Sequence, residues 1–484
     1  MTRPPALALR DDIAAGRTSA VQHCAATLAE LDGAGRRLNA VITVAGERAR
    51  ERAKAIDASR GDGGPLAGVP IAVKDNICTR GLRTTAASRV LEHYVPPYDA
   101  TVVERLEAAG AVIVAKTNCD EFAMGSSSEH SAFGPVRNPW DLERTAGGSS
   151  GGSAALVAAR VVPIALGSET GGSVRQPAAL CGITGLKPTY GRISRYGLIA
   201  FASSLDQVGI FATSAADVGA CLEVIAGRDP RDPTTSAATV EEYVDAAGGD
   251  VRGLRIGVPR ALAGDGVDEG VRKAFDEALE ILRSAGAALV DIALPHSRYA
   301  TATYTIVAMA EASSNLGRFD GVRYGTRAEA DTLVEMYART RGLFGHEVKR
   351  RIMLGTYVLS AGYYEAYYVK AQKVRALIRQ DYDRAFSEVD VVATPTSPTT
   401  AFALGERLAD PVQMYLADVF TVSANLAGIP ALSVPCGLTG GLPVGLQLTG
   451  PAWSEARLLR VAGAFERLTP WAEEPVPSAW RNSE

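Results

Sequence analysis

Glycine and serine concentrate in two neighbouring stretches, GGSSGGSAALVAA at 147–159 and GSETGGSVRQPAA at 167–179. Serine hydroxyls can act as nucleophiles, and glycines let backbone N–H groups approach a charged group closely. A flexible linker would not run directly into apolar segments typical of helices and strands, as these stretches do. The pattern therefore indicates a site for either a phosphate or an oxyanion.

A phosphate site is the less favoured interpretation. No lysine follows these glycines at the spacing GxxxxGK[ST], and no GxGxxG with a downstream acidic residue follows an apolar strand. A nucleotide-binding module remains the alternative from another functional class. A shift of the melting temperature by ATP or NAD would distinguish it from a hydrolase.

A Ser-His-Asp hydrolase is also disfavoured, although residues 147–151 match G-x-S-x-G. That motif requires a preceding strand, and residues 141–145 (DLERT) are polar and charged, which does not favour a strand there. The five histidines lie in undistinguished surroundings, at positions 23, 93, 130, 296 and 346.

A neutral lysine can replace histidine as the base if burial lowers its pKa. Lys74 ends the apolar run 68–73, and Lys116 ends the equally apolar run 112–115. The residue pattern does not choose between them, because either lysine could instead cover a sheet end with its ammonium in water.

Three motifs resemble the amidase signature family, whose members use a Ser–cis-Ser–Lys triad. They are GVPIAVKDN with Lys74, AGGSSGGSAA with Ser149, and GSETGGSVRQPAALCGITGLKPTYGR with Ser173. The resemblance implies that Ser173 is the nucleophile and that Lys74 takes its proton through Ser149. It also implies a cis peptide bond between Gly148 and Ser149.

The same resemblance implies an oxyanion hole made by backbone N–H groups of Thr170, Gly171, Gly172 and Ser173. Glu169 stands where many relatives have aspartate, and this change keeps the carboxylate.

The resemblance extends to one branch of the family, the A subunits of bacterial glutamyl-tRNA(Gln)/aspartyl-tRNA(Asn) amidotransferases. It is carried by residues 187–209, 311–325, 349–375 and 414–437. It implies that the chain needs no cofactor and hydrolyses glutamine to release ammonia. The B subunit would then use ATP and Mg²⁺ to amidate a misacylated tRNA, and the C subunit would complete a heterotrimer for protein biosynthesis.

Three further positions match residues that bind glutamine in these subunits: Tyr304, Arg351 in KRRIMLGTY, and Asp418 in MYLADVF. A guanidinium suits the α-carboxylate of an amino acid, and a carboxylate suits its ammonium. The alternative within the fold is a stand-alone amidase that hydrolyses another small amide. The sequence does not indicate whether Glu-tRNA(Gln), Asp-tRNA(Asn) or both are served.

The composition is that of an ordinary folded protein. Of 484 residues, 47% are hydrophobic and 21% are charged, and the net charge of −4 offers no overall attraction for nucleic acid or an anionic membrane. The six cysteines are scattered, without metal-ligand spacing, and no signal peptide or membrane-spanning run is visible. We expect a cytoplasmic protein without a metal site.

The candidate site residues must be positioned by the strands and helices that the sequence predicts from its apolar runs and helical patterns. Residues 1–60 are expected to form a helical segment, and residues 61–484 the amidase signature domain, with a helical insertion at about 300–385. Strands are expected near 69–73, 111–115, 254–258, 288–292, 389–393, 431–434 and 444–448. Their alternation with helices predicts mainly parallel pairing. The resemblance implies an α/β fold with a mixed central β-sheet flanked by helices on both faces.

Overall fold

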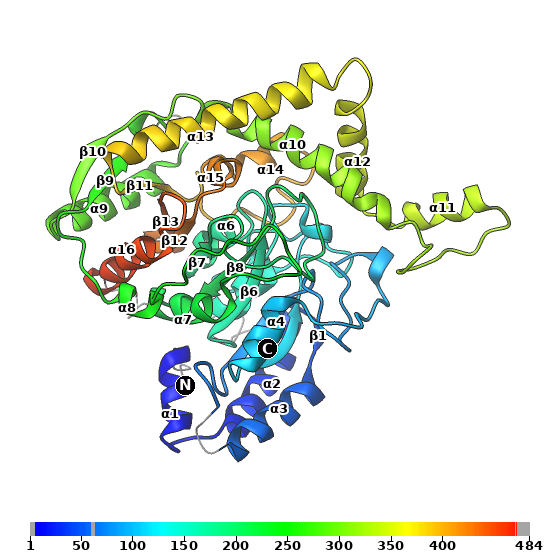
Figure 1. Ribbon diagram of the computed structural model, residues 1–484, viewed down its shortest axis with the longest axis horizontal. Coiled ribbons are helices and arrows are strands. Elements are labelled where there is room, and N and C mark those ends of the chain that lie inside the picture. Colours follow the sequence, from blue (N-terminus) through cyan, green and yellow to red (C-terminus); the bar gives the residue numbers. More distant parts are fainter. Residues whose placement is uncertain (1–4, 60–62, 263, 265, 470, 472–484) are drawn as a thin grey trace.

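The structure is a computed structural model that describes residues 5–59, 63–262, 264, 266–469 and 471. In this part of the chain, an 11-stranded sheet runs in the order β1-β3-β2-β6-β8-β7-β12-β13-β11-β9-β10 (Figure 1). Its first strands are β1 (Val41–Val44), β2 (Pro70–Lys74), β3 (Val112–Thr117), β6 (Ile164–Glu169), β7 (Thr184–Lys187) and β8 (Gln207–Ala212). The later strands are β9 (Arg255–Val258), β10 (Ala288–Asp291), β11 (Val391–Pro395), β12 (Ala431–Thr439) and β13 (Leu442–Thr449).

The sheet is mixed. Parallel pairing joins β2 to β3 and β6, and β9 to β10 and β11. The other neighbours in the large sheet pair antiparallel. The expectation of mainly parallel pairing is therefore wrong for the centre of the sheet. The sequence pattern missed β8, and the β12–β13 hairpin lies between β7 and β11.

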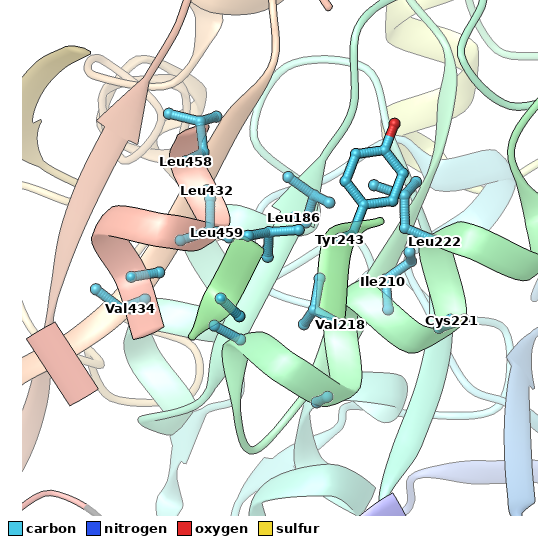
Figure 2. Close-up of a cluster of buried hydrophobic side chains, with 14 of the residues drawn as sticks. Leu186, Ile210, Val218, Cys221, Leu222, Tyr243, Leu432, Val434, Leu458 and Leu459 are labelled. Atoms are coloured by element: carbon cyan, nitrogen blue, oxygen red, sulfur yellow. The ribbon is translucent and has the colours of Figure 1, made fainter. Parts of the chain in front are cut away.

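Helices cover both faces, because successive side chains of a strand point to opposite sides. In β2, Ile71 and Val73 join one buried apolar cluster, and Ala72 joins another. The first cluster is covered by α4 (Thr101–Ala108), α7 (Ala215–Ile225), α8 (Tyr243–Ala247), α9 (Glu269–Ser284) and α16 (Glu455–Leu468). Figure 2 shows Leu186, Ile210 and Leu432 of the sheet beneath side chains of α7, α8 and α16.

The opposite face packs against a second set of helices. Next to the glycine-rich stretches these are α5 (Gly151–Ala158) and α6 (Arg175–Cys181). Further along the sheet they include α10 (Ala300–Asn315), α13 (Lys370–Glu388) and α15 (Val422–Ala427). Residues 300–388 also form α11 (Leu333–Gly342) and α12 (His346–Val358), and α14 (Pro411–Leu416) precedes α15. In Figure 1, α10, α12 and α13 lie together at one end of the molecule.

The N-terminal segment lies at the other end of the molecule (Figure 1). The sequence predicts a helical segment here, but the structure also contains a strand. It contains α1 (Ala6–Ala14), α2 (Ala20–Arg37) and α3 (Gly46–Ala58), but β1 between them pairs with β3 at the sheet edge. The segment therefore shares the main sheet. The predicted boundary between residues 60 and 61 lies outside the described residues, and the division of the chain into two parts stays a prediction.

Candidate active site

Lys74, the last residue of β2, is fully buried (0% exposed). Its Nζ lies 2.7 Å from Ser149 Oγ, 2.9 Å from Ser150 Oγ and 3.0 Å from Ser168 Oγ. Burial lowers the pKa of this amine to about 8, although nearby acidic groups act in the opposite direction. Lys74 is thus placed to exchange a proton with Ser149 and is partly neutral near neutral pH.

Lys116 on the neighbouring strand β3 is equally buried but makes different contacts. Its Nζ donates to Ile77 O at 2.6 Å and to Thr84 Oγ1 at 2.7 Å, and lies 3.6 Å from Asp75 Oδ1. The geometry separates the two lysines that the sequence left equivalent: Lys74 faces the serines, whereas Lys116 holds the segment that follows β2.

Ser149 lies in a backbone segment that only small residues can form. The Gly148–Ser149 peptide bond is cis, as the resemblance implied, and Gly147 has a φ of +79°. A Cβ atom on Gly148 would lie 2.3 Å from Asp120 Oδ2. The Gly148 N–H donates to Gln176 Oε1 at 3.0 Å. Both glycines are therefore needed for the close approach around Ser149.

Residues 170–173 form a tight turn between β6 and α6, here called the glycine loop. Its carbonyl groups are held: Gly171 O accepts from Thr421 Oγ1 at 2.6 Å, and Ser173 O accepts from Ser150 N at 3.3 Å. Within the described residues, no acceptor contacts the N–H groups of Gly171, Gly172 and Ser173. These donors are available to stabilise an oxyanion next to Ser173, which is 7% exposed.

Buried carboxylates anchor both ends of the glycine loop. Asp206 Oδ1 accepts from Thr170 Oγ1 at 2.7 Å, and burial raises the pKa of Asp206 to about 6. Glu169 forms a buried ion pair with Arg175 and accepts from the Arg175 backbone N–H at 3.0 Å. Glu169, which stands where many relatives have aspartate, therefore still holds the start of α6 through its carboxylate.

Asp418 and Tyr304 lie directly against the glycine loop. A Cβ atom on Gly171 would lie 2.5 Å from Tyr304 Cζ, and one on Gly172 would lie 2.5 Å from Asp418 Oδ1. Asp418 Oδ2 accepts a hydrogen bond from Ser126 Oγ, but Oδ1 is buried and has no partner among the described residues. Burial raises the pKa of Asp418 to about 7. When the Asp418 carboxyl is ionised, this unpaired buried oxygen can accept a hydrogen bond from a cationic group.

Arg351 on α12 supplies the opposite charge and is 5% exposed. Its Nε donates to Glu347 Oε1 at 2.8 Å, and its guanidinium carbon lies 5.5 Å from the Phe201 ring centre and 5.3 Å from that of Tyr415. Burial alone would lower the pKa of Arg351, but Glu347, Tyr415 and Tyr304 together outweigh this effect, so that the pKa is raised and the group stays cationic. We call Tyr304, Arg351 and Asp418 the amino acid pocket, after the role that the sequence resemblance predicts for them, and this role stays a prediction here.

Several residues of the site were not singled out from the sequence: Ser150, Ser168, Ser126, Asp206 and Glu347. Only Glu347 had a local signal, because a glutamate four residues before an arginine pairs with it on a helix. The other contacts join residues far apart in the sequence. The expectation that the polar residues Asp141–Thr145 form no strand is wrong, since they make β5 of a two-stranded sheet with β4 (Arg137–Asn138).

Metal sites and membrane spans are both absent from the part of the chain that the structure describes. These residues contain no cluster of three or more His, Cys, Asp or Glu side chains arranged to hold a metal ion. Within the same ranges, no helix is long and apolar enough to cross a membrane.

The fold, with a buried lysine and serines beside a loop of free N–H groups, defines the class of an amide-hydrolysing enzyme. A family model described as Amidase matches residues 23–459. The chain belongs to the amidase family.

Known relatives place it more narrowly. The chain is 58% identical over 463 residues to the A subunit of the glutamyl-tRNA(Gln) amidotransferase of Chloroflexus aurantiacus, with 95% of each chain covered. The crystal structure of the A subunit from Thermotoga maritima is 44% identical, covers 95% of this chain and 94% of its own, and has a TM-score of 0.79. The peptide amidase of Stenotrophomonas maltophilia is 32% identical, with 98% of each chain covered and a TM-score of 0.82. The fold alone does not separate the two kinds of enzyme, but sequence identity favours the amidotransferase subunit.

Proposed function

We propose that this chain is the glutamine-hydrolysing subunit of a tRNA-dependent amidotransferase. The observation that carries the proposal is the charge pattern of the amino acid pocket. The three residues include one buried cation, Arg351, and one unpaired carboxylate oxygen, Asp418 Oδ1. Asp418 lies against the glycine loop, and Arg351 is near enough to lower the pKa of Asp418, although burial raises that pKa more strongly. A free amino acid carries a carboxylate and an ammonium, so this pair suits glutamine better than an uncharged amide.

In the proposed reaction, Ser173 Oγ attacks the side-chain amide carbon of glutamine. Its proton passes to Ser149, and the proton of Ser149 passes to neutral Lys74. The glycine loop donates hydrogen bonds to the oxygen that becomes negative. When the C–N bond breaks, Lys74 returns the proton through Ser149 to the leaving nitrogen, and ammonia is released. Water then hydrolyses the acyl ester to glutamate.

The ammonia would be used by a partner rather than released. Relatives whose name marks them as the A subunit imply further subunits, and we propose that the B and C subunits and a misacylated tRNA complete the complex. ATP and Mg²⁺ would bind to the B subunit. The described cysteines form no disulfides, which suits the reducing cytoplasm in which aminoacyl-tRNA is made.

The test is to assay the assembled complex with two nitrogen donors. Arg351→Ala and Asp418→Asn should each lower kcat/KM for glutamine by about 30- to 1,000-fold, because one charge of glutamine then remains unpaired. Amidation with free ammonium chloride should stay within about twofold, since ammonia bypasses the pocket.

Ser173→Ala is the matched control, because it should abolish glutamine use and also retain the ammonia-dependent reaction. If both pocket variants keep wild-type glutamine kinetics, the glutamine assignment is wrong. Hydrolysis of other small amides in preference to glutamine would favour the stand-alone amidase.

A further inference from the structure

Glu347 lies one helical turn before Arg351 on α12 and is 4% exposed. Its Oε1 accepts from Arg351 Nε and from the Tyr415 hydroxyl, each at 2.8 Å. Its Oε2 accepts from Arg350 Nη1 at 2.6 Å. Both oxygens of this carboxylate are therefore bonded, and three side chains fix its orientation.

These contacts leave one part of the Arg351 guanidinium free. The rings of Phe201 and Tyr415 pack near it, and Glu347 takes its Nε. Within the described ranges, neither terminal nitrogen of Arg351 has a hydrogen-bond partner. Two parallel N–H groups at the end of a fixed guanidinium match the two oxygens of a carboxylate.

The charges of this group also suit an anion. Arg350 and Arg351 contribute two positive charges and Glu347 one negative charge, so the cluster carries a net charge of +1. A substrate carboxylate would bring it to zero. Without Glu347, two neighbouring cations would repel each other, and Arg351 would keep its contacts with the rings of Phe201 and Tyr415 but lose its hydrogen bond to a carboxylate.

We propose that Glu347 is a positioning residue that aims Arg351 at the α-carboxylate of the substrate and so gives the enzyme its preference for amino acid amides. The inference rests on the proposed function, because it assumes that the amino acid pocket binds glutamine. Glu347 itself does not touch the reacting atoms, and its effect passes through Arg351.

The experiment compares glutamine with 4-aminobutanamide, which keeps the ammonium and the amide but lacks the α-carboxylate. Both are assayed by ammonia release with the full chain in its assembled complex. Glu347→Ala should lower kcat/KM for glutamine by about 30- to 300-fold, mainly through KM, and change that for 4-aminobutanamide by less than about threefold. Glu347→Gln keeps an acceptor for Arg351 Nε but loses the negative charge and the acceptor for Arg350, so it should recover only part of the loss.

Equal losses on both substrates would mean that Glu347 is only structural, and unchanged glutamine kinetics would also overturn the proposal. Failure of the proposed function has a different signature: the wild-type enzyme itself would then show no preference for glutamine over 4-aminobutanamide.

Two further variants keep the test informative. Glu455 forms a comparable buried pair with Arg192 away from the pocket. Glu455→Gln should therefore lower the melting temperature without changing the preference for glutamine. If Glu347→Ala does not fold, Tyr415→Phe removes one hydrogen bond to Glu347 and keeps the ring. Tyr415→Phe should raise KM for glutamine by about three- to tenfold and leave KM for 4-aminobutanamide unchanged. An unchanged KM for glutamine would contradict the proposal.

Discussion

Lys74 and Lys116 have the same burial but different partners, and their substitution should separate chemistry from stability. Lys74→Ala removes the base next to Ser149 Oγ and should lower kcat for glutamine hydrolysis by about 10³-fold or more while the chain stays folded. Steady-state kinetics and a melting curve measure the two effects.

Lys116→Met is the matched variant. It leaves Asp75 buried without its cation, which we expect to cost about 3 kcal/mol of folding stability, while the folded fraction turns over glutamine normally. A variant at Lys116 that melts normally but has lost its turnover would show that the base has been placed on the wrong strand.

The pH dependence of the reaction follows from two groups of the site. Lys74, with a pKa lowered to about 8, must be neutral to accept a proton, and Asp418, with a pKa raised to about 7, must be ionised to bind an ammonium. The fraction of neutral Lys74 and the fraction of ionised Asp418 both increase as the pH rises. We therefore expect kcat/KM for glutamine to rise by about 100-fold or more between pH 6 and pH 8 and to level off at higher pH.

Initial rates over that range measure this profile, and melting temperatures over the same range exclude unfolding as its cause. A profile that is flat, or that falls with pH, would contradict a neutral lysine base.

At the scale of single residues, the sequence was informative where chemistry requires a short motif. The serines, the glycines and Lys74 stand in such motifs, so their positions could be predicted, and the structure brings Lys74 and Ser149 together. The supporting residues could not be predicted in this way. Asp206 contacts Thr170, and Ser126 contacts Asp418, across long sequence separations, and these contacts depend on the complete fold.

At the scale of elements, the glycine loop has no room for side chains on the side of the amino acid pocket. Gly172→Ala would place a Cβ atom 2.4 Å from Thr421 Oγ1 and 2.5 Å from Asp418 Oδ1. The loop must then shift, so that its N–H groups no longer point at the oxyanion, and we expect kcat/KM for glutamine to fall by about 100-fold or more.

Gly317→Ala is the control for this change, because nothing lies within 4 Å of its added Cβ atom. Kinetics and melting temperature should stay close to those of the unchanged chain. Normal glutamine hydrolysis by Gly172→Ala would mean that the loop is not the oxyanion hole.

Apolar runs predicted β2, β3 and β9 to β13 because buried strands are continuous hydrophobic segments. The same criterion missed β1, a short edge strand within a helical pattern, and β5, whose residues are mostly polar and only partly buried. It also could not show that β12 and β13 pair antiparallel at the centre of the sheet. Pairing partners depend on the path of the whole chain rather than on local composition.

For the whole molecule, the proposed function predicts that the isolated chain hydrolyses glutamine slowly. Addition of the B and C subunits, and of the misacylated tRNA, should raise kcat by about tenfold or more, because coupling of the active site to a partner limits futile glutamine consumption. Ammonia release measured with each component omitted in turn tests this expectation. A fully active monomer with no affinity for these subunits would identify a stand-alone amidase.

The place of the β12–β13 hairpin in the sheet has a consequence for synthesis on the ribosome. The hairpin lies between β7 and β11, yet its residues (431–449) follow β7 (Thr184–Lys187) by more than two hundred positions in the chain. Until these residues leave the exit tunnel, β7 and β11 each present an unpaired edge, a state prone to aggregation. Asp418 also emerges late. The nascent chain should therefore need chaperone protection until the hairpin has emerged, and the proposed glutamine pocket stays incomplete until Asp418 has emerged.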